Sequence, residues 1–456
     1  MSARRWSERA VGATVFPAWA LKEHRGYARF RRELERTQYW EPAHLAELQQ
    51  RRLLELVRHA ESNCRFYRER FRAAGIEWAA DGRVQGWERI PPLTKREIQD
   101  HRLELAADPY PAKDRIGNQT GGSTGSPLQF LVDRRRMATR MASTHRHNAW
   151  AGMRPGDWVA QLWGARLDEV PTAGWWAWCR QHALHRLLFF NTAQISDQNW
   201  ESYLVTLRKH RPRFLLAYAR SAAALAEHVL ARGLTDIRFE AVITTAEVLL
   251  PEHRQQIEAA FGGKVFNRYG CREVSVIASE CREHDGMHVN AEALLVEIVS
   301  APGVPEPWGK VLITDLLNRS MPLIRYEVGD VARWAEGACR CGRQLPRLAA
   351  VEGRTTDFLE LPDGASVSGP VLTLVFADMP TVRQVQFVQR GKGEVRLRVI
   401  PGQGFDEQAR QQMRARLRPY LRDAVPLRIE EVSALASEAS GKYRFVVHEA
   451  AEEGRS

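Results

Sequence analysis

The sequence predicts an α/β fold, in which a large N-terminal domain with mixed, mainly parallel, helix-covered sheets precedes a small α+β domain. Two observations lead to this fold class. Short apolar runs alternate with helical patterns in the middle of the chain, which is typical of parallel strands covered by helices. After Gly353 the pattern changes to alternating strands around one Arg-rich helix. The 456 residues suffice for two or three domains.

The elements of the N-terminal domain follow from apolar spacing and from helix end signals. Pro251 and the Gly262-Gly263 pair delimit one helix, because proline suits a first helical turn and glycine a helix end. Thr94 and Glu97 have capping-box spacing for another. The predicted helices lie at 41–74, 137–150, 196–210, 221–232 and 252–261, and the predicted strands at 214–217, 241–245, 264–266, 294–299 and 311–315.

The C-terminal part predicts a compact β-β-α-β unit. A hairpin at 384–388 and 394–400 precedes a helix at 405–422 and a strand at 427–432. We therefore place a domain boundary near Arg354, which gives domains 1–353 and 354–456.

Composition limits the class of protein. Apolar residues make up 44% and charged residues 27%, which disfavours a disordered or membrane-bundle protein. The net charge of +11 suits anionic ligands such as nucleotides or coenzymes. Nucleic acid would rest on charge alone and is not expected, because the basic residues are spread along the chain. Six cysteines are too few for a disulfide scaffold, and no membrane span is predicted, so we expect a cytoplasmic protein.

The segment Asn118–Pro127 is rich in glycine and hydroxyl side chains. Its amides and hydroxyls could hold phosphates, whereas the alternative is a plain surface loop. It is not a Walker loop, because no lysine follows its last glycine. It is not a dinucleotide-binding fingerprint either, because the spacing of its glycines differs from that motif. Three later segments follow it in order: Tyr269–Glu273, Tyr326–Asp330 with Gly353-Arg354, and Ser440–Lys442.

This ordered set resembles the adenylate-forming superfamily, in particular its phenylacetate–CoA ligase branch and the relatives of that branch in capsule and natural-product gene clusters. The segments Pro92–Glu97, Thr244–Glu247, Pro322–Tyr326 and Cys339–Arg343 support the branch. The resemblance implies ATP-dependent activation of an acid as acyl-AMP, followed by transfer to a nucleophile, and a C-terminal domain that turns on a hinge.

The resemblance also implies roles for residues. Glu273 would hold Mg²⁺, Lys442 would meet the α-phosphate, and Asp330 would bind the ribose, with Arg354 reaching the ribose or α-phosphate. The other implied nucleotide-binding residues are Thr120, Gly121, Gly122, Ser123, Thr124, Gly125, Thr245, Ala246, Glu247, Tyr269 and Gly270. Trp163 and Tyr218 are candidates for the acyl pocket. Arg272 stands where relatives carry Thr or Ser, and it could pair with the substrate, with phosphate or with Glu247. Gly121 stands where relatives usually carry Ser, so the phosphate loop has one hydroxyl fewer. Ser126 stands where many relatives carry Lys, so the loop also lacks that cation.

Cys281, His288, Cys339 and Cys341 form a second group. Three thiolates and one imidazole are a complete ligand set for structural zinc, although the spacing is looser than in a zinc ribbon. The alternative is three core or surface thiols beside a histidine. The other cysteines have no partners in the sequence. The cluster Trp175–Trp178 could line a pocket or pack in a core or an oligomer interface.

We therefore expect an AMP-forming ligase that activates an aryl or other apolar acid, with ATP and Mg²⁺ and with CoA as acceptor. Transfer to an amine, a hydroxyl or a carrier protein is the first alternative. A degenerate, non-catalytic nucleotide-binding protein is the second. A homodimer is left open.

Overall fold

The structure is a computed structural model of the chain, and it falls into two compact units. The larger contains the described residues up to Glu297 together with 311–328 and 333–350, and the smaller contains 298–310, 329–332 and the described residues from Val351 onward. The described residues are 8, 10–78, 84–108, 110–119, 128–163, 184–192, 197–300, 304, 306–354, 358–361, 366–368, 372, 375–376, 379, 381–390, 394–421, 425–435 and 445–449.

Helices dominate the first third of the larger unit. They are η1 (Val11–Val15), α2 (Phe16–Glu23), α3 (Tyr27–Thr37), α4 (Pro42–Asn63), α5 (Arg65–Ala73), α6 (Lys95–Asp100), α7 (Arg102–Leu105) and α8 (Arg134–Trp150), with the short turns η2 (Trp87–Arg89) and η3 (Ala112–Asp114). The helical pattern at 41–74 is two helices, because Cys64 takes an extended conformation between α4 and α5. The Thr94–Glu97 capping box is formed at the start of α6.

An eleven-stranded mixed sheet forms the centre of the fold. Its order is β12-β13-β14-β15-β11-β10-β9-β8-β7-β5-β6. The bounds are β5 (Val159–Trp163), β6 (Leu187–Asn191), β7 (Phe214–Tyr218), β8 (Ala241–Thr245), β9 (Lys264–Cys271), β10 (Ser275–Glu280), β11 (Met287–Val289), β12 (Leu294–Val299), β13 (Gly309–Asp315), β14 (Tyr326–Trp334) and β15 (Arg347–Arg354). Two hairpins, β1 (Glu77–Trp78) with β2 (Val84–Gln85) and β3 (Arg115–Gln119) with β4 (Gln129–Asp133), lie outside it.

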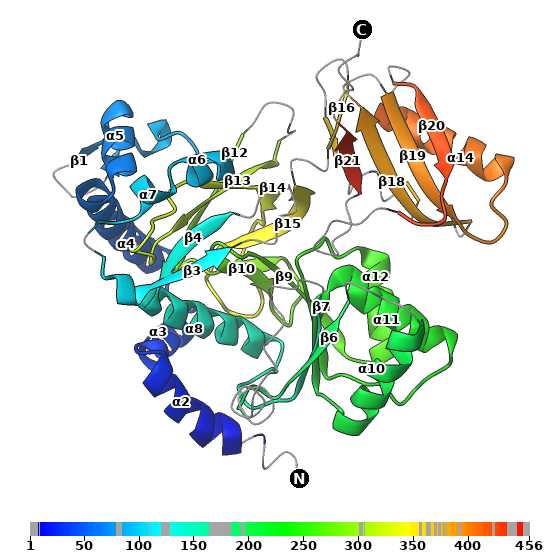
Figure 1. The fold of residues 1–456 in the computed structure, drawn as a ribbon, viewed down its shortest axis with the longest axis horizontal. Coiled ribbons are helices and arrows are strands. Elements are labelled where there is room, and N and C mark those ends of the chain that lie inside the picture. Colours follow the sequence, from blue (N-terminus) through cyan, green and yellow to red (C-terminus); the bar gives the residue numbers. More distant parts are fainter. Residues whose placement is uncertain are drawn as a thin grey trace. The chain divides into compact units, whose positions relative to one another are not determined.

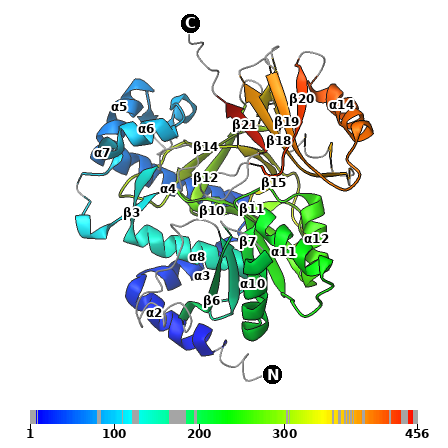
Figure 2. The ribbon, with the colours of Figure 1, turned by 45° about the vertical axis from the view of Figure 1, so that its right-hand side comes forward.

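Strands β5 to β9 form the parallel part of this sheet, as the alternation of apolar runs and helices predicted. Helices α10 (Asp197–His210), α11 (Ala219–Ala231) and α12 (Pro251–Phe261) lie together beside β6 and β7, whereas α3 and α8 lie side by side elsewhere (Figures 1 and 2). The strand face toward α10–α12 buries Ala160, Leu162, Leu215, Ala217, Val242 and Val265. The opposite face buries Val159, Phe214, Ala241, Ile243 and Phe266 with Ala151 and Met153, which follow α8. Both faces are therefore covered, which explains why these strands are apolar without alternation.

The smaller unit contains a four-stranded sheet in the order β20-β19-β18-β21. Its elements are β18 (Val382–Arg390), β19 (Glu394–Pro401), α14 (Glu407–Leu421), β20 (Leu427–Glu431) and β21 (Val446–Glu449), with the hairpin β16 (Phe358–Glu360) and β17 (Ser366–Ser368). The predicted hairpin, helix and strand are present, and β21 adds a fourth strand parallel to β18. Phe387, Leu397, Met413 and Leu417 form a fully buried core between sheet and helix.

Buried ion pairs hold α8 to the rest of the larger unit. Arg146 makes two hydrogen bonds to the Glu292 carboxylate, at 2.6 and 3.0 Å, and the Thr37 hydroxyl donates a third at 2.6 Å. Arg136 lies 2.8 Å from the Asp315 carboxylate, and both side chains are fully buried. Three of the arginines of this helix, Arg136, Arg140 and Arg146, are therefore buried in the larger unit. None of the helices in the described part of the chain has the length and apolar character of a membrane span.

We predict that Arg146→Met lowers the free energy of unfolding by about 3–5 kcal/mol, because it leaves Glu292 as a buried charge without its partner. Urea unfolding of the full chain, followed by tryptophan fluorescence, measures this loss. The control is Arg208→Met, which breaks a half-exposed pair with Asp236 and should leave the free energy of unfolding nearly unchanged. Equal midpoints for the two variants would contradict this account of α8.

Candidate functional site

One row of side chains crosses the carboxyl ends of the parallel strands. Tyr218 on β7 pairs with Thr245 on β8, and Thr245 pairs with Arg268 on β9. Trp163 ends β5 beside Tyr218, and their ring centroids lie 4.5 Å apart. Neighbouring residues in register point to the same face of a sheet, so these four side chains share one face. In open α/β sheets, ligands bind at this edge. The predicted pocket residues Trp163 and Tyr218 and the predicted nucleotide residue Thr245 are therefore neighbours.

The backbone turns sharply after β8. Ala246 has φ +68°, a left-handed conformation that an L-residue other than glycine seldom adopts. Strained residues of this kind collect at functional sites. The next residue, Glu247, accepts a hydrogen bond from the backbone N–H of Arg220 near the start of α11, at 3.0 Å. The turn thus fixes the Glu247 carboxylate close to the end of β7.

Tyr269 and Gly270 lie at the end of β9, where it pairs with β10. A Cβ on Gly270 would lie 2.7 Å from the Ser275 carbonyl oxygen, so the close approach of the two strands requires glycine. A β-bulge between Val276 and Ala278 follows on β10. Bulges re-aim side chains next to functional sites.

Glu273 lies in the tight connection between β9 and β10 and is buried. Its Oε1 accepts a hydrogen bond of 2.8 Å from the hydroxyl of Tyr326 on β14. The two residues that flank Tyr326 are bonded to Leu93 through the backbone. The Leu93 N–H donates to the Arg325 carbonyl, and the Glu327 N–H donates to the Leu93 carbonyl, at 2.9 Å each. The predicted Mg²⁺ ligand is therefore a positioned carboxylate.

Two arginines of α8 hold the backbone of the same connection, and sequence reasoning missed them. Arg140 donates to the carbonyls of Arg272 and Glu273, and Arg136 donates to that of Val274 at 3.2 Å. Burial lowers the pKa of Arg140 to about 10, and the charge of Arg136 acts in the same direction. A signal was present: α8 contains several arginines and no acidic residue, so their partners had to lie elsewhere.

The remaining predicted nucleotide residues are placed only in part. Asp330 lies on β14, within the short segment assigned to the smaller unit, and Arg354 ends β15. The phosphate loop Thr120–Gly125, Ser126, Lys442 and the side chain of Arg354 lie outside the described residues, as does Trp175–Trp178. The partners proposed for the Arg272 side chain, which are the substrate, a phosphate group and Glu247, stay predictions.

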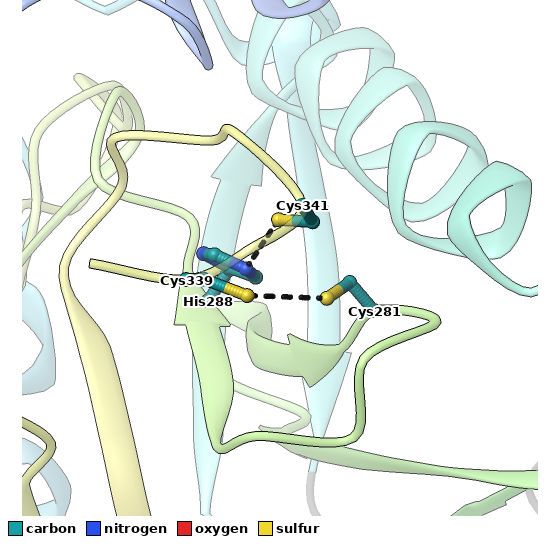
Figure 3. A group of neighbouring side chains, drawn as sticks. All are labelled: Cys281, His288, Cys339 and Cys341. Atoms are coloured by element: carbon teal, nitrogen blue, oxygen red, sulfur yellow. Dashed lines mark hydrogen bonds between the residues drawn. The ribbon is translucent and has the colours of Figure 1, made fainter.

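The predicted metal ligands come together in the larger unit. Cys281 follows β10, His288 lies on β11, and Cys339 and Cys341 lie in the connection from β14 to β15 (Figure 3). The four ligand atoms all lie within 4.8 Å of one another. Cys281 Sγ is 3.7 Å from Cys339 Sγ, and Cys341 Sγ is 3.2 Å from His288 Nε2.

These distances fit a tetrahedral zinc site. Zinc–sulfur bonds of about 2.3 Å place two sulfur ligands about 3.8 Å apart, whereas a disulfide needs about 2.0 Å. Burial, together with the nearby charges of Arg343 and Arg347, lowers the pKa of His288 to about 4, which favours the neutral imidazole that a metal ligand requires. Arg343 stacks on Trp150 and donates to the side chain of Gln38, which fixes the loop that carries the two cysteines.

The sequence is similar to those of characterised ligases. It is 28% identical over 375 residues to the phenylacetate–coenzyme A ligase of Thermus thermophilus, which covers 79% of this chain and 82% of that protein. The corresponding ligase of Escherichia coli K12 is 26% identical over 69% of this chain and 72% of its own length. Protein CapK of Staphylococcus aureus is 22% identical over 89% of each chain. The family model of the CapK C-terminal domain matches residues 359–449.

The fold is similar to that of solved adenylate-forming enzymes. A 2-hydroxyisobutyryl-CoA ligase in the postadenylation state aligns with TM-score 0.74 at 20% identity, covering 91% of this chain and 92% of that one. An anthranilate–CoA ligase bound to anthranoyl-AMP aligns with TM-score 0.53 at 15% identity, over 78% and 73%. In sequence the chain is thus similar to phenylacetate–CoA ligases, and its fold is that of solved acyl-CoA ligases that form acyl-AMP.

Proposed function

We propose that the protein activates a carboxylic acid with ATP and transfers the acyl group to the thiol of CoA. A carboxylate oxygen attacks the α-phosphorus, the bond to the bridging oxygen breaks, and pyrophosphate leaves. The thiolate then attacks the acyl carbon and displaces AMP. The observation that carries this proposal is the placement of Thr245, Tyr269 and a positioned Glu273 around one sheet edge, in a chain similar to phenylacetate–CoA ligases.

Each predicted residue has a role in this proposal. The loop Thr120–Gly125 holds the β- and γ-phosphates, and Tyr269 lies beside adenine. Asp330 accepts hydrogen bonds from the ribose hydroxyls, and Arg354 reaches the ribose or the α-phosphate. Lys442 brings a cation to the α-phosphate, where charge builds up in the transition state. The division into domains 1–353 and 354–456, with a hinge near Arg354, belongs to the same proposal.

Glu273 is the residue that would hold Mg²⁺. A carboxylate suits this hard cation, and the hydrogen bond from Tyr326 orients the Glu273 carboxylate through one oxygen, Oε1. Bound there, the ion would neutralise charge on the phosphate oxygens. Tyr326 acts through Glu273 and is therefore a positioning residue.

We also propose one structural zinc ion on Cys281, His288, Cys339 and Cys341. The donor set and the spacing of its atoms support it. Four protein ligands leave no position for substrate, so the ion would cross-link two loops of the larger unit. We also propose a cytoplasmic location, with which it agrees that Cys64 and the three cysteines of this cluster form no disulfide.

A second acceptor class has its own support. The C-terminal match is to the CapK domain, and an amide bond synthetase from Marinactinospora thermotolerans aligns with TM-score 0.51 at 18% identity over 73% of this chain and 67% of that one. The alternative is transfer from acyl-AMP to an amine, a hydroxyl or a carrier protein. Pyrophosphate release across a panel of acids, with and without CoA, separates the acceptors. Stimulation by CoA supports the thioester synthetase, release without a CoA effect supports the other ligases, and no release with any acid overturns adenylation.

We predict that Glu273→Gln slows acid-dependent pyrophosphate release by about 10²-fold or more, because an amide cannot hold the metal on the phosphates. Initial rates at saturating ATP measure this. Full activity in this variant would refute the assignment of Glu273.

The same measurement tests Tyr326. Tyr326→Phe should raise the Mg²⁺ concentration needed for half-maximal rate by about 10-fold, since loss of an orienting partner weakens metal affinity by that order. The matched control is Tyr203→Phe, which removes a hydroxyl that donates to the Asn191 carbonyl away from Glu273. A change in maximal rate at unaltered Mg²⁺ dependence would argue against a positioning role.

Lys442→Ala separates the two half-reactions. It should slow acyl-AMP formation by several orders of magnitude and leave transfer from synthetic acyl-AMP to CoA much less affected, because the hinge presents Lys442 in only one orientation. Lys264→Ala, which removes an exposed lysine, is the control. If both half-reactions fall equally, the C-terminal unit is misfolded; if adenylation is unchanged, Lys442 is not the lysine that meets the α-phosphate.

Protein purified without added metal should contain one zinc ion per chain by elemental analysis. Cys339→Ser should lower that ratio and the thermal stability together, because the binding energy of a structural metal is folding energy. Cys64→Ser, at a buried cysteine outside the cluster, should keep the full ratio. Metal-free wild-type protein with unchanged stability would exclude the site.

A further inference from the structure

Arg268 is a buried arginine at one end of the carboxyl-edge row, which consists of Trp163, Tyr218, Thr245 and Arg268. Only 8% of the residue is exposed. Phe266 on the same strand packs against Ala151 and Met153, which follow α8. Side chains two residues apart on a strand share a face, so Arg268 points to that side of the sheet, as Trp163 and Tyr218 do. Its position is therefore on the face that carries the predicted acyl pocket.

Arg268 differs from other buried arginines of the larger unit. Arg136, Arg146 and Arg347 each have a carboxylate within 2.8 Å. Within the described part of the chain, no carboxylate lies within ion-pair distance of Arg268, and its guanidinium donates to the Asn148 side chain alone. An unpaired buried cation is costly to the fold, so a compensating anion is expected.

Unsatisfied polar atoms mark the same place. Arg268 Nε is buried and has no partner among the described residues. Ser279 on β10 is the cross-strand partner of Arg268 on β9 and is 3% exposed. Its buried Oγ likewise has no hydrogen-bond partner within the described residues. Buried donors without partners are rare in native proteins. Because Arg268 and Ser279 are cross-strand partners, both groups could donate to the same ligand group that accepts hydrogen bonds.

The row has two chemically different ends. The aromatic rings of Trp163 and Tyr218 form one end, Thr245 lies between, and Arg268 with Ser279 forms the other. Tyr218 and Arg268 are two strands apart, or about 10 Å between backbones. An aromatic ring could lie on the apolar end while a substituent reaches the guanidinium.

From this we propose that Arg268 is a specificity-determining residue that binds a second acidic group of the substrate, so that the acid activated is an aromatic acid with a carboxylate besides the one that reacts. This inference rests on the proposed function. It revises the expectation of a wholly apolar acid. Arg268 takes no part in the chemical steps: it holds the far end of the substrate through charge-assisted hydrogen bonds.

Rates of pyrophosphate release test the proposal with acids matched in size. The probes are 3- and 4-carboxyphenylacetate against 3- and 4-methylphenylacetate. We expect the wild-type protein to prefer one of the carboxylated acids by about 10-fold or more in kcat/KM, because charged hydrogen bonds to a buried group discriminate strongly. Arg268→Met, which keeps the volume, should lose that preference and leave the methyl acids within about 2-fold. Arg268→Lys should retain part of it.

Two results would overturn the proposal. One is a wild-type protein that prefers the methyl acids or treats both kinds alike. The other is an Arg268→Met protein, folded by its circular dichroism spectrum, that loses activity equally with all four acids, since Arg268 would then serve the reacting carboxylate or the fold. Arg208→Met, at the surface, should change nothing and controls for net charge.

A binding measurement separates this inference from the proposed function. The carboxylated acids alone should raise the melting temperature of the wild-type protein and leave that of Arg268→Met unchanged, because a ligand stabilises only the state that binds it. If no acid releases pyrophosphate but this difference is present, the proposed activity fails and the Arg268 site stands. An equal shift, or none, in both proteins contradicts the site.

Discussion

The register of the parallel strands β5, β7, β8 and β9 is the constraint on which the site depends. One face of each strand packs against α10–α12, and the other carries the row of site residues. If the pairing of a strand slipped by one residue, its side chains would exchange these two faces. The observed register brings Trp163, Tyr218, Thr245 and Arg268 into one row. The helices that cover the sheet therefore fix the composition of the ligand-binding edge.

Buried arginines of α8 hold the connection that carries Glu273, the proposed Mg²⁺ ligand. Arg136 and Arg140 reach from α8 to the carbonyls around Glu273, and Asp315 compensates the charge of Arg136. A guanidinium can satisfy several carbonyls at once because its donors form a rigid fork. These hydrogen bonds fix the short connection between β9 and β10 that contains Glu273. Arg268 differs from Arg136 and Arg146, which have carboxylate partners, because no carboxylate within the described part of the chain forms an ion pair with Arg268.

Much of the fold could be predicted from the sequence, and the reasons differ between elements. Strand β8 was identifiable from its apolar run, and helix α12 from Pro251 at its start and Gly262 at its end. Both signals depend only on residues close together in the sequence. The proposed zinc ligands were identifiable by chemical type, although the contact between Cys281 and Cys339 depends on how β11 pairs with β15. The roles of Arg136, Arg140 and Tyr326 depend on contacts between distant segments, and the left-handed Ala246 has no signature in sequence. Such features need coordinates.

The central claim is that the protein forms an acyl-AMP at this edge of the sheet, and isotope transfer tests it most directly. The acid is labelled with ¹⁸O in both carboxylate oxygens and incubated with ATP, Mg²⁺, CoA and the full-length protein, and the AMP produced is analysed by mass spectrometry. Attack of the carboxylate on the α-phosphorus predicts AMP that carries one ¹⁸O atom, because the bridging oxygen leaves with phosphorus when the acyl group is transferred. AMP without label, formed in step with the acyl product, would contradict the account.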